Sequence, residues 1–209
     1  MATVVADMSM TLDGFVADPD DRVDHVFAWL QKGQHTVTPH GDKEAFRVDE
    51  ASAEELRAGF DQVGALIAGR RLFDLAHGWG GQHPAGVPVY VVTHSAPEAW
   101  PYPEAPFTFV TDGVGSAVAQ AKAAAGDKIV GVASPSIAQQ CLDLGLLDAV
   151  RVSLVPVLLG RGIRYFDNLR NAPVLLSDHP RVVPGVGVTH LYYDVVKEAA
   201  STPAPPDGA

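Results

Sequence analysis

Residues 63–77 have the sequence VGALIAGRRLFDLAH, in which a short apolar run ends at a glycine and is followed at once by an amphipathic segment. An uninterrupted apolar run of this length predicts a buried strand over 63–69, because strands of a parallel sheet are covered on both faces. The next residues predict a helix over 70–77. A strand followed directly by a helix is the repeating unit of an α/β sheet.

The same alternation continues toward the C-terminus. Alternating strands and helices predict a mostly parallel sheet with right-handed crossovers. Two final strands, expected over 172–179 and 187–196, have no helix between them, which predicts an antiparallel C-terminal edge. Between these regions we expect strands over 88–94, 106–110, 127–133 and 149–160, and helices over 114–126 and 136–145.

The first sixty residues follow this pattern less closely. Ser52 and Glu55 have the Ser-x-x-Glu spacing of a capping box, which predicts a helix over 53–62. Upstream of that helix we expect a buried strand over 2–8, a helix fragment over 26–30 and a long loop over 31–51.

Composition excludes several classes of protein. The chain of 209 residues has 25 acidic and 15 basic side chains, a net charge of −10, which argues against binding to nucleic acid or to an anionic membrane. No apolar run approaches the roughly 20 residues that span a bilayer, and the start lacks the basic region of a signal peptide. We expect a cytoplasmic protein with a single domain over 1–197 and a disordered tail over 198–209.

The cysteine and histidine residues give no metal signal. Cys141 is the only cysteine and lies in a predicted apolar helix, which is typical of a small core residue. His35 and His40 lie in a predicted loop without a third ligand at metal spacing, and His77 and His83 flank a glycine-rich loop. We therefore expect no metal site.

Ligands of an open α/β sheet bind beyond the carboxyl ends of its parallel strands, where loops lead into helix N-termini. The first such junction here is Gly69-Arg70-Arg71. Arginine at a helix start opposes the helix dipole, and a bound anion such as a phosphate would offset that cost. The alternative is a pair of solvated surface arginines.

The second junction, Thr93-His94-Ser95, offers hydroxyls and an imidazole to a phosphate or a ring, although the same residues suit an ordinary turn. The third junction precedes the helix expected over 136–145, and Ser134 with Pro135 also suits a helix N-cap. Its candidate ligand-binding residues are Gly131, Val132, Ala133, Ser134 and Ser136. A Rossmann G-x-G-x-x-G motif is absent.

Asp13 precedes Gly14 shortly after the first predicted strand. Asp-Gly is a strong turn signal, so Asp13 is expected at a turn. The position also allows its carboxylate to reach a ligand at the carboxyl edge of the sheet.

Three motifs occur in a distinctive order: TLDGFVA over 11–17, ALIAGRRLFD over 65–74 and VYVVTHS over 89–95. A fourth segment over 145–166 runs from a helix-ending glycine through a strand to Gly-Arg-Gly and an aromatic pair. Together they resemble the dihydrofolate reductase-like superfamily, and more closely the group related to the C-terminal reductase domain of the bifunctional riboflavin-biosynthesis deaminase/reductase. The resemblance covers about residues 3–196 and implies a three-layer α/β fold.

The resemblance also implies an NADPH-dependent oxidoreductase that forms a homodimer. Its motifs would place Gly69, Arg70 and Arg71 beside the cofactor phosphates, with Arg70 at the 2′-phosphate, and Asp13 toward the substrate, to orient it or relay a proton. Thr93, His94 and Ser95 would surround the adenosine, and the turn from Gly131 to Ser136 would hold the pyrophosphate.

The implied substrate is a small heterocyclic, carbonyl or imine compound, with a riboflavin-precursor pyrimidine as one candidate. Two departures from the family bear on this. Val132 replaces a glycine common in the third turn, and that turn lacks an acidic residue expected in the pyrimidine-reductase branch. A catalytically degenerate NADP(H)-binding or ligand-sensing module is therefore the alternative.

Overall fold

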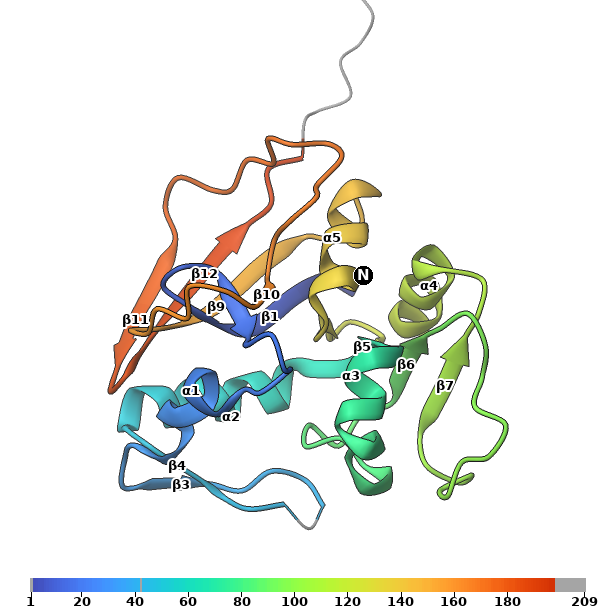
Figure 1. The fold of residues 1–209 in the computed structure, drawn as a ribbon, viewed down its shortest axis with the longest axis horizontal. Helices are drawn as coiled ribbons and strands as arrows, with labels where there is room; N and C mark the ends of the chain where they lie inside the picture. The colour runs from blue at the N-terminus through green and yellow to red at the C-terminus, as the bar shows by residue number, and fades with distance from the viewer. Residues whose placement is uncertain (1, 42, 198–209) are drawn as a thin grey trace, which may run out of the picture.

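The computed structural model describes residues 2–41 and 43–197. Its centre is an eight-stranded sheet (Figure 1). The strands are β1 (Val4–Thr11), β5 (Val63–Gly69), β6 (Val89–Val92), β7 (Phe107–Val110), β8 (Ile129–Val132), β9 (Ala149–Val155), β11 (Arg181–Gly185) and β12 (Val188–Asp194). Their order is β11-β12-β9-β1-β8-β5-β6-β7, and only β11 and β12 pair antiparallel to their neighbours. The predicted parallel sheet with an antiparallel C-terminal edge is confirmed.

Helices cover both faces of the sheet and give the predicted three layers (Figure 1). Helices α4 (Val114–Ala125) and α5 (Pro135–Asp143) pack on one face, and α2 (Glu50–Gln62) and α3 (Arg70–Leu75) lie on the other. The shorter elements are α1 (Asp24–Phe27), the 3₁₀ turns η1 (Ala28–Gln31) and η2 (His77–Gly81), and the strands β2 (Phe15–Ala17), β3 (His35–Val37), β4 (Phe46–Val48) and β10 (Ile163–Arg164).

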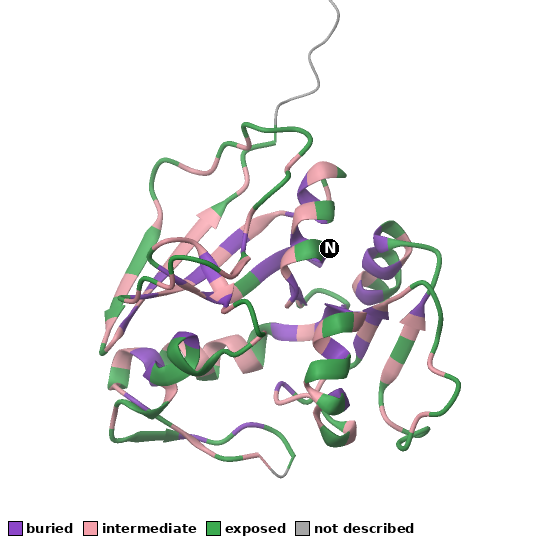
Figure 2. Cartoon of the chain, viewed as in Figure 1, coloured by how far each residue is buried: buried purple, intermediate pink, exposed green. Residues whose placement is uncertain are grey.

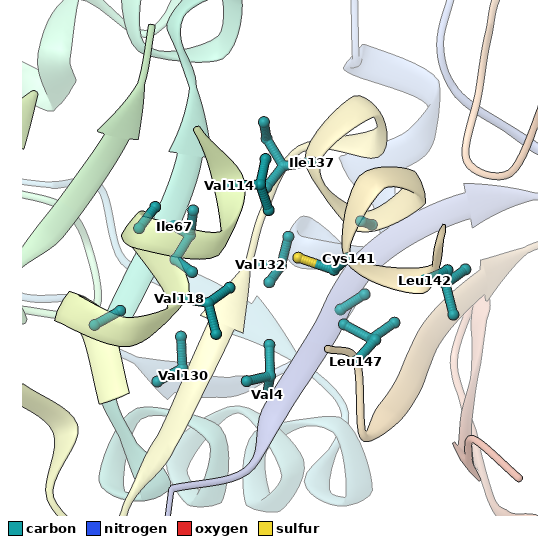
Figure 3. Packing of buried hydrophobic residues seen from close by; sticks show 14 of the residues in the cluster. Val4, Ile67, Val114, Val118, Val130, Val132, Ile137, Cys141, Leu142 and Leu147 are labelled. Atoms are coloured by element: carbon teal, nitrogen blue, oxygen red, sulfur yellow. The ribbon is translucent and has the colours of Figure 1, made fainter. Parts of the chain in front are cut away.

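The main hydrophobic core lies between the sheet and helices α4 and α5. Val4, Val130 and Ile67 project from neighbouring strands toward Val118 of α4, and Cys141 of α5 packs beside them (Figure 3). Burial raises the pKa of the Cys141 thiol to about 12, so the thiol stays protonated at neutral pH and Cys141 is a core residue. Buried positions concentrate in these central strands and on the sheet-facing sides of the helices (Figure 2).

The predicted capping box at Ser52 is wrong. Helix α2 begins at Glu50, and its N-cap is Asp49, whose Oδ1 accepts a hydrogen bond from the Ser52 amide at 3.1 Å. Ser52 is buried within the first turn, and Glu55 is bound to Arg181 rather than to a helix-start amide. An aspartate three residues upstream satisfies the same amide, so the Ser-x-x-Glu spacing occurs here without the box.

Two other expectations about elements are wrong. The loop expected over 31–51 contains an antiparallel hairpin of β3 and β4. The strand expected over 172–179 is reduced to one bridge between Leu176 and Val195, and the edge strand is β11, which tolerates Pro184 because an edge position leaves some amides unpaired. The short pair of β2 and β10 was not expected. The tail predicted over 198–209 lies outside the described residues.

Candidate functional site

A pocket of about 420 Å³ lies on the α2 and α3 side of the sheet. Strands β1, β5, β8, β9 and β12 supply its floor, and α2 and the segment from η1 to β4 supply one wall. The loop around η2 supplies the other. Ala133, Gly131 and Ser9 belong to its lining, so the pocket reaches the carboxyl ends of β1 and β8. In an open α/β sheet this is the edge where ligands bind.

Strand register arranges the polar side chains of the floor in two rows. In the first row, Asp7 of β1 is opposite Arg151 of β9, which is opposite Tyr192 of β12. In the second row, Ser9, Ser153 and His190 stand in the same relation. Because successive side chains of a strand point to opposite faces, residues two apart share the pocket face.

The first row contains two charged side chains and lies beside the ion pair of Arg181 with Glu55. Arg181 holds the Glu55 carboxylate with two hydrogen bonds of 2.7 and 2.6 Å, and Tyr192 also donates to it. The Arg181 guanidinium lowers the pKa of Glu55 to about 2. Asp7 is open to the pocket yet deeply enclosed by protein, and this desolvation raises its pKa although Arg151 acts in the opposite direction.

The second row is tied to the pocket wall by hydrogen bonds. Trp29 Nε1 donates to Ser9 Oγ at 3.1 Å. His190 lies between two hydroxyls, with Nδ1 3.1 Å from Ser153 Oγ and Nε2 3.1 Å from Ser52 Oγ. The ring meets Trp29 edge to face, with ring centroids 5.2 Å apart. Burial of His190 lowers its pKa, so the ring is neutral at pH 7.

Aromatic side chains form much of the pocket wall. Trp79 lies in the loop where residues 77–80 have positive φ, and its ring meets His83 edge to face. Burial lowers the pKa of His83 to about 4, with Lys43 acting in the same direction, so His83 is neutral at pH 7. Phe60 of α2 and Phe27 of α1 complete a wall suited to a flat, uncharged ring.

The structure brings two of the predicted junctions into direct contact at the sheet edge. The Gly69 amide donates to Ser134 Oγ at 2.8 Å. Ser134 is the N-cap of α5 and Pro135 opens that helix, as predicted. The Ser134 hydroxyl, however, accepts its hydrogen bond from Gly69 instead of from a helix amide. The start of α3 and the start of α5 therefore lie side by side.

Arg70 connects these two junctions to the second predicted junction, Thr93-His94-Ser95. Its Nη1 donates to the Ser95 carbonyl at 3.0 Å, its Nε donates to Asp74, and Thr93 Oγ1 donates to the same Ser95 carbonyl at 2.8 Å. Arg71 pairs with Asp21. The chain thus supplies Asp74 and Asp21 as the anions that offset both arginines. Nη2 of Arg70 has no hydrogen-bond partner among the described residues, and the edge as a whole offers the cationic and hydroxyl donors that suit a phosphate-bearing ligand.

The remaining residues of the third turn divide between the two faces. Val132 is buried in the core under α4 and α5, so its side chain faces away from the edge. Gly131 and Ala133 line the pocket. Ser136 and His94 are exposed at the edge.

Asp13 lies at the turn between β1 and β2, and it is not among the pocket-lining residues. Its carboxylate accepts hydrogen bonds from Thr11 Oγ1 at 2.6 Å, from the Gly160 amide at 2.7 Å and from the Leu159 amide at 3.3 Å. The Thr11 hydroxyl, followed by the two amides, lowers the pKa of Asp13. Through these hydrogen bonds, Asp13 fastens the turn between β1 and β2 to the loop after β9.

The sheet order, the antiparallel edge and a pocket at the strand ends define a dihydrofolate reductase-like α/β protein. Within that class the chain belongs to the RibD C-terminal domain family, whose model matches residues 2–179. No curated protein matches the sequence.

Solved structures agree on the fold. A putative riboflavin biosynthesis protein from Shewanella sp. PV-4 is 21% identical, with a TM-score of 0.69 over 94% of this chain and 100% of that one. A diaminohydroxyphosphoribosylaminopyrimidine deaminase/5-amino-6-(5-phosphoribosylamino)uracil reductase from Thermotoga maritima is 13% identical, with a TM-score of 0.60 over 93% of this chain and 57% of that one. A dihydrofolate reductase from Enterococcus faecalis, complexed with NADP(H) and RAB-propyl, is 11% identical, with a TM-score of 0.56 over 94% and 97% of the two chains.

The polar rows of the floor were not predicted. Asp7, Ser9, Arg151, Ser153 and His190 lie inside segments whose overall apolar character indicated only strands. The signal was the period-two placement of polar residues in VADMS and VRVSL, which distinguishes a pocket face from a core face. Within residues 2–41 and 43–197, no three His, Cys, Asp or Glu side chains gather closely enough to hold a metal ion. No helix in that same part of the chain is long and apolar enough to cross a membrane.

Proposed function

We propose that this protein is an NADPH-dependent reductase that transfers a hydride to a small heterocyclic, carbonyl or imine substrate bound in the pocket. The observation that carries the proposal is the continuity of the pocket with the sheet edge at Ala133. The Gly69–Ser134 contact and Arg70 lie at that edge. Membership in the RibD C-terminal domain family supports it, as does the NADP(H) complex of the structurally similar dihydrofolate reductase.

The edge residues divide by the part of NADPH that each suits. Arg70 with Thr93, His94 and Ser95 would hold the adenosine and its 2′-phosphate. Gly69, Arg71 and the turn from Gly131 to Ser136 would hold the pyrophosphate, which suits the start of α5. NADPH supplies the hydride, and the chain supplies position and charge around it.

The pocket suits a flat polar substrate. Its walls are aromatic, whereas Asp7, Arg151 and Ser153 offer polar atoms on the floor. A riboflavin-precursor pyrimidine has this character, and the structurally similar Thermotoga maritima enzyme is named as a reductase of one such compound, 5-amino-6-(5-phosphoribosylamino)uracil. We propose this pyrimidine as one candidate beside pteridine-like and other carbonyl or imine compounds.

Thermal unfolding with NADPH, with NADH and without ligand tests the cofactor. A ligand at one hundred times its Kd stabilises a protein by about 2.7 kcal/mol. We expect a larger Tm increase with NADPH than with NADH, and equal shifts would remove the 2′-phosphate site from the proposal. Arg70→Ala should weaken NADPH more than NADH, whereas Arg170→Ala, at an exposed position outside the site, is the matched control.

Asp13→Asn tests the predicted substrate role of Asp13. A direct role predicts lower turnover with NADPH binding retained. Unchanged turnover together with lower stability would leave Asp13 as the fastening of its turn, which the hydrogen bonds to Leu159 and Gly160 favour.

The second candidate function is an NADP(H)-binding or ligand-sensing module without turnover. The observation that favours it is the altered third turn, in which Val132 replaces glycine and no acid is present. Both candidates predict NADPH binding, and only the reductase oxidises NADPH when a pyrimidine or pteridine substrate is added. Absorbance at the NADPH band separates the two.

A homodimer and a cytoplasmic location complete the proposal. Exposed apolar side chains on and beside the C-terminal edge support the homodimer: Val182 and Val186, with Leu175 and Val196 nearby, are each about half exposed or more. Light scattering coupled to gel filtration measures the mass directly, and a monomer at micromolar concentration would overturn the dimer.

A further inference from the structure

Four side chains form a continuous hydrogen-bonded chain from the start of α2 to the pocket floor, here named the Asp49–Ser153 chain. Ser52 Oγ lies 2.7 Å from Asp49 Oδ2 and 3.1 Å from His190 Nε2. Ser153 Oγ lies 3.1 Å from His190 Nδ1 at the other side of the ring. His190 and Ser153 line the pocket.

The carboxylate at the far end fixes the direction of each hydrogen bond. Desolvation raises the pKa of Asp49, but hydrogen bonds from Val186 and Ser52 outweigh it and the pKa is lowered, so Asp49 is an ionised acceptor. Ser52 gives its only hydroxyl proton to Asp49, and its oxygen must then accept from Nε2–H of His190. In the neutral ring Nδ1 is left as an acceptor, and Ser153 donates to it.

Protonation of His190 reverses the last of these bonds. An imidazolium donates from both nitrogens, so Ser153 accepts from Nδ1–H and turns its own hydroxyl proton toward the pocket. Burial lowers the pKa of His190. Glu55 and Asp49 from the α2 region raise it, and Arg181 from β11 lowers it further. An imidazolium in these surroundings gives up its proton readily, and His190 determines whether the floor presents a donor or an acceptor.

We propose that Ser153 is the proton donor of the reduction, and that His190, Ser52 and Asp49 act as positioning residues that supply and orient its proton; this inference rests on the proposed reductase function. When the carbon of a C=N or C=O bond receives hydride, its π electron pair moves to the nitrogen or oxygen. That atom takes the Ser153 hydroxyl proton, and Ser153 Oγ takes the proton from Nδ1. The ring is left neutral with its proton on Nε2, and solvent returns a proton to Nδ1.

The backbone of β11 closes the outer end of the Asp49–Ser153 chain. A Cβ at Gly185 would lie 2.4 Å from Ser52 Oγ and 3.0 Å from Asp49 Oδ2. Only glycine leaves room for Ser52 to bond the carboxylate and the ring together. The Asp49–Ser153 chain is therefore a packed arrangement rather than a chance alignment of exposed groups.

Nitrogen-15 NMR of the 209-residue chain with labelled histidine tests the proton order without any ligand. We expect a neutral His190 with protonated Nε2 and bare Nδ1, titrating below the ordinary histidine pKa. Asp49→Asn retains a capping side chain but removes the charge, so it should lower the His190 pKa further and populate the Nδ1–H form. Glu50→Gln, an exposed neighbour at the same helix start, is the matched control and should change neither. A neutral wild-type ring that carries its single proton on Nδ1 would overturn the proposal.

Turnover then tests the proton donor with whichever substrate the NADPH oxidation assay identifies. Ser153→Ala should lower kcat roughly 10²-fold with little change in KM, the size typical of a lost general acid. Ser153→Thr, which keeps the hydroxyl, should restore most of the rate. Wild-type kcat should decrease as pH rises through the His190 pKa measured by NMR, and His190→Gln should remove that decrease.

Asp7 is the competing donor, because its raised pKa also keeps a proton near the pocket. A kcat lost in Asp7→Asn and retained in Ser153→Ala would overturn the assignment to Ser153. Failure to bind NADPH in the thermal-shift test would overturn the reductase function instead, while the NMR result on the ring would stand unchanged. The two failures are therefore distinguishable.

Discussion

The two faces of the central sheet are made by the same strands but carry opposite chemistry. On β1, Val4 and Ala6 point into the core under α4 and α5 and are fully buried, whereas Asp7 and Ser9 point to the pocket. The same alternation on β9 places Val150 and Val152 in the core and Arg151 and Ser153 at the pocket. One face stabilises the fold by excluding water, and the other holds polar atoms where a ligand can reach them.

This comparison shows why the charged side chains of β1 and β9 lie on the pocket face. Each polar side chain on the floor either has a hydrogen-bond partner, as Ser9 and Ser153 do, or is open to the pocket, as Asp7 is. The core face under α4 and α5 is lined by apolar side chains, and an unpaired polar group placed there would carry its full desolvation cost. A shift of one residue along β1 therefore separates a tolerated carboxylate from a destructive one.

The largest expected loss of stability comes from moving a carboxyl group by one residue along β1, from the pocket face to the core face. Ala6→Asp places an unpaired carboxyl in the dry core, at a cost of about 3–5 kcal/mol or more, which rivals the stability of a typical domain. We expect loss of the cooperative unfolding transition in urea. Asp7→Ala, one residue further, is the control and should retain that transition, and equal losses in the two variants would refute the assignment of faces.

Alanine substitutions at two adjacent apolar residues of β5 compare the same two faces, with a smaller expected loss of stability. Ile67 is fully buried under α4 and α5, and Leu66 lies on the other face at the pocket. Ile67→Ala should cost about 4 kcal/mol because it leaves a closed cavity, and Leu66→Ala about 2 kcal/mol because its cavity joins the pocket. Chemical denaturation measures both. A larger loss for Leu66→Ala would mean that the pocket face contributes more packing than the core face.

The strand and helix order was predictable because it depends on local patterns. The apolar run over 63–69 forms the buried strand β5, and Gly126 ends α4 with positive φ as a helix-ending glycine should. The strand expected over 172–179 failed for a physical reason. Leu176 packs against the main core from an irregular segment, so its apolar character reflects burial without strand pairing.

The candidate site was predictable only in part. Gly69, Arg70 and Ser134 were expected near one another because they lie at or just beyond strand ends, and those ends converge at one edge. His190 and Ser52 are 138 residues apart, and no local pattern reports that they meet. Their contact depends on the register of β12 on β9 and on the N-cap of α2 at Asp49, and both follow from packing rather than from spacing.

The N-cap of α2 links the fold to the pocket and gives an effect of intermediate size. Asp49→Ala removes the hydrogen bond to the Ser52 amide and should cost about 1 kcal/mol, as loss of an N-cap usually does. Asp49→Asn keeps a capping oxygen and should cost less. Urea denaturation of the two variants separates capping from charge, and equal losses would show that the carboxylate charge, rather than the cap, is what stabilises α2.

The smallest expected effect is the pH dependence that Asp7 contributes to stability. Its pKa is raised in the folded state by desolvation, so folding favours the protonated form. The penalty is absent below the ordinary aspartate pKa of 3.8, grows as pH rises through the raised pKa, and is constant above it. Asp7→Asn removes the penalty, and the variant should gain stability relative to wild type at pH 7 but not at pH 3.5. Because Glu55 and Asp49 have lowered pKa values in both proteins, their opposite pH dependence cancels in the difference between the two urea curves. A difference that does not change with pH would show that Asp7 is solvated like a surface carboxylate, and that the pocket floor is wetter than the register of β1 and β9 implies.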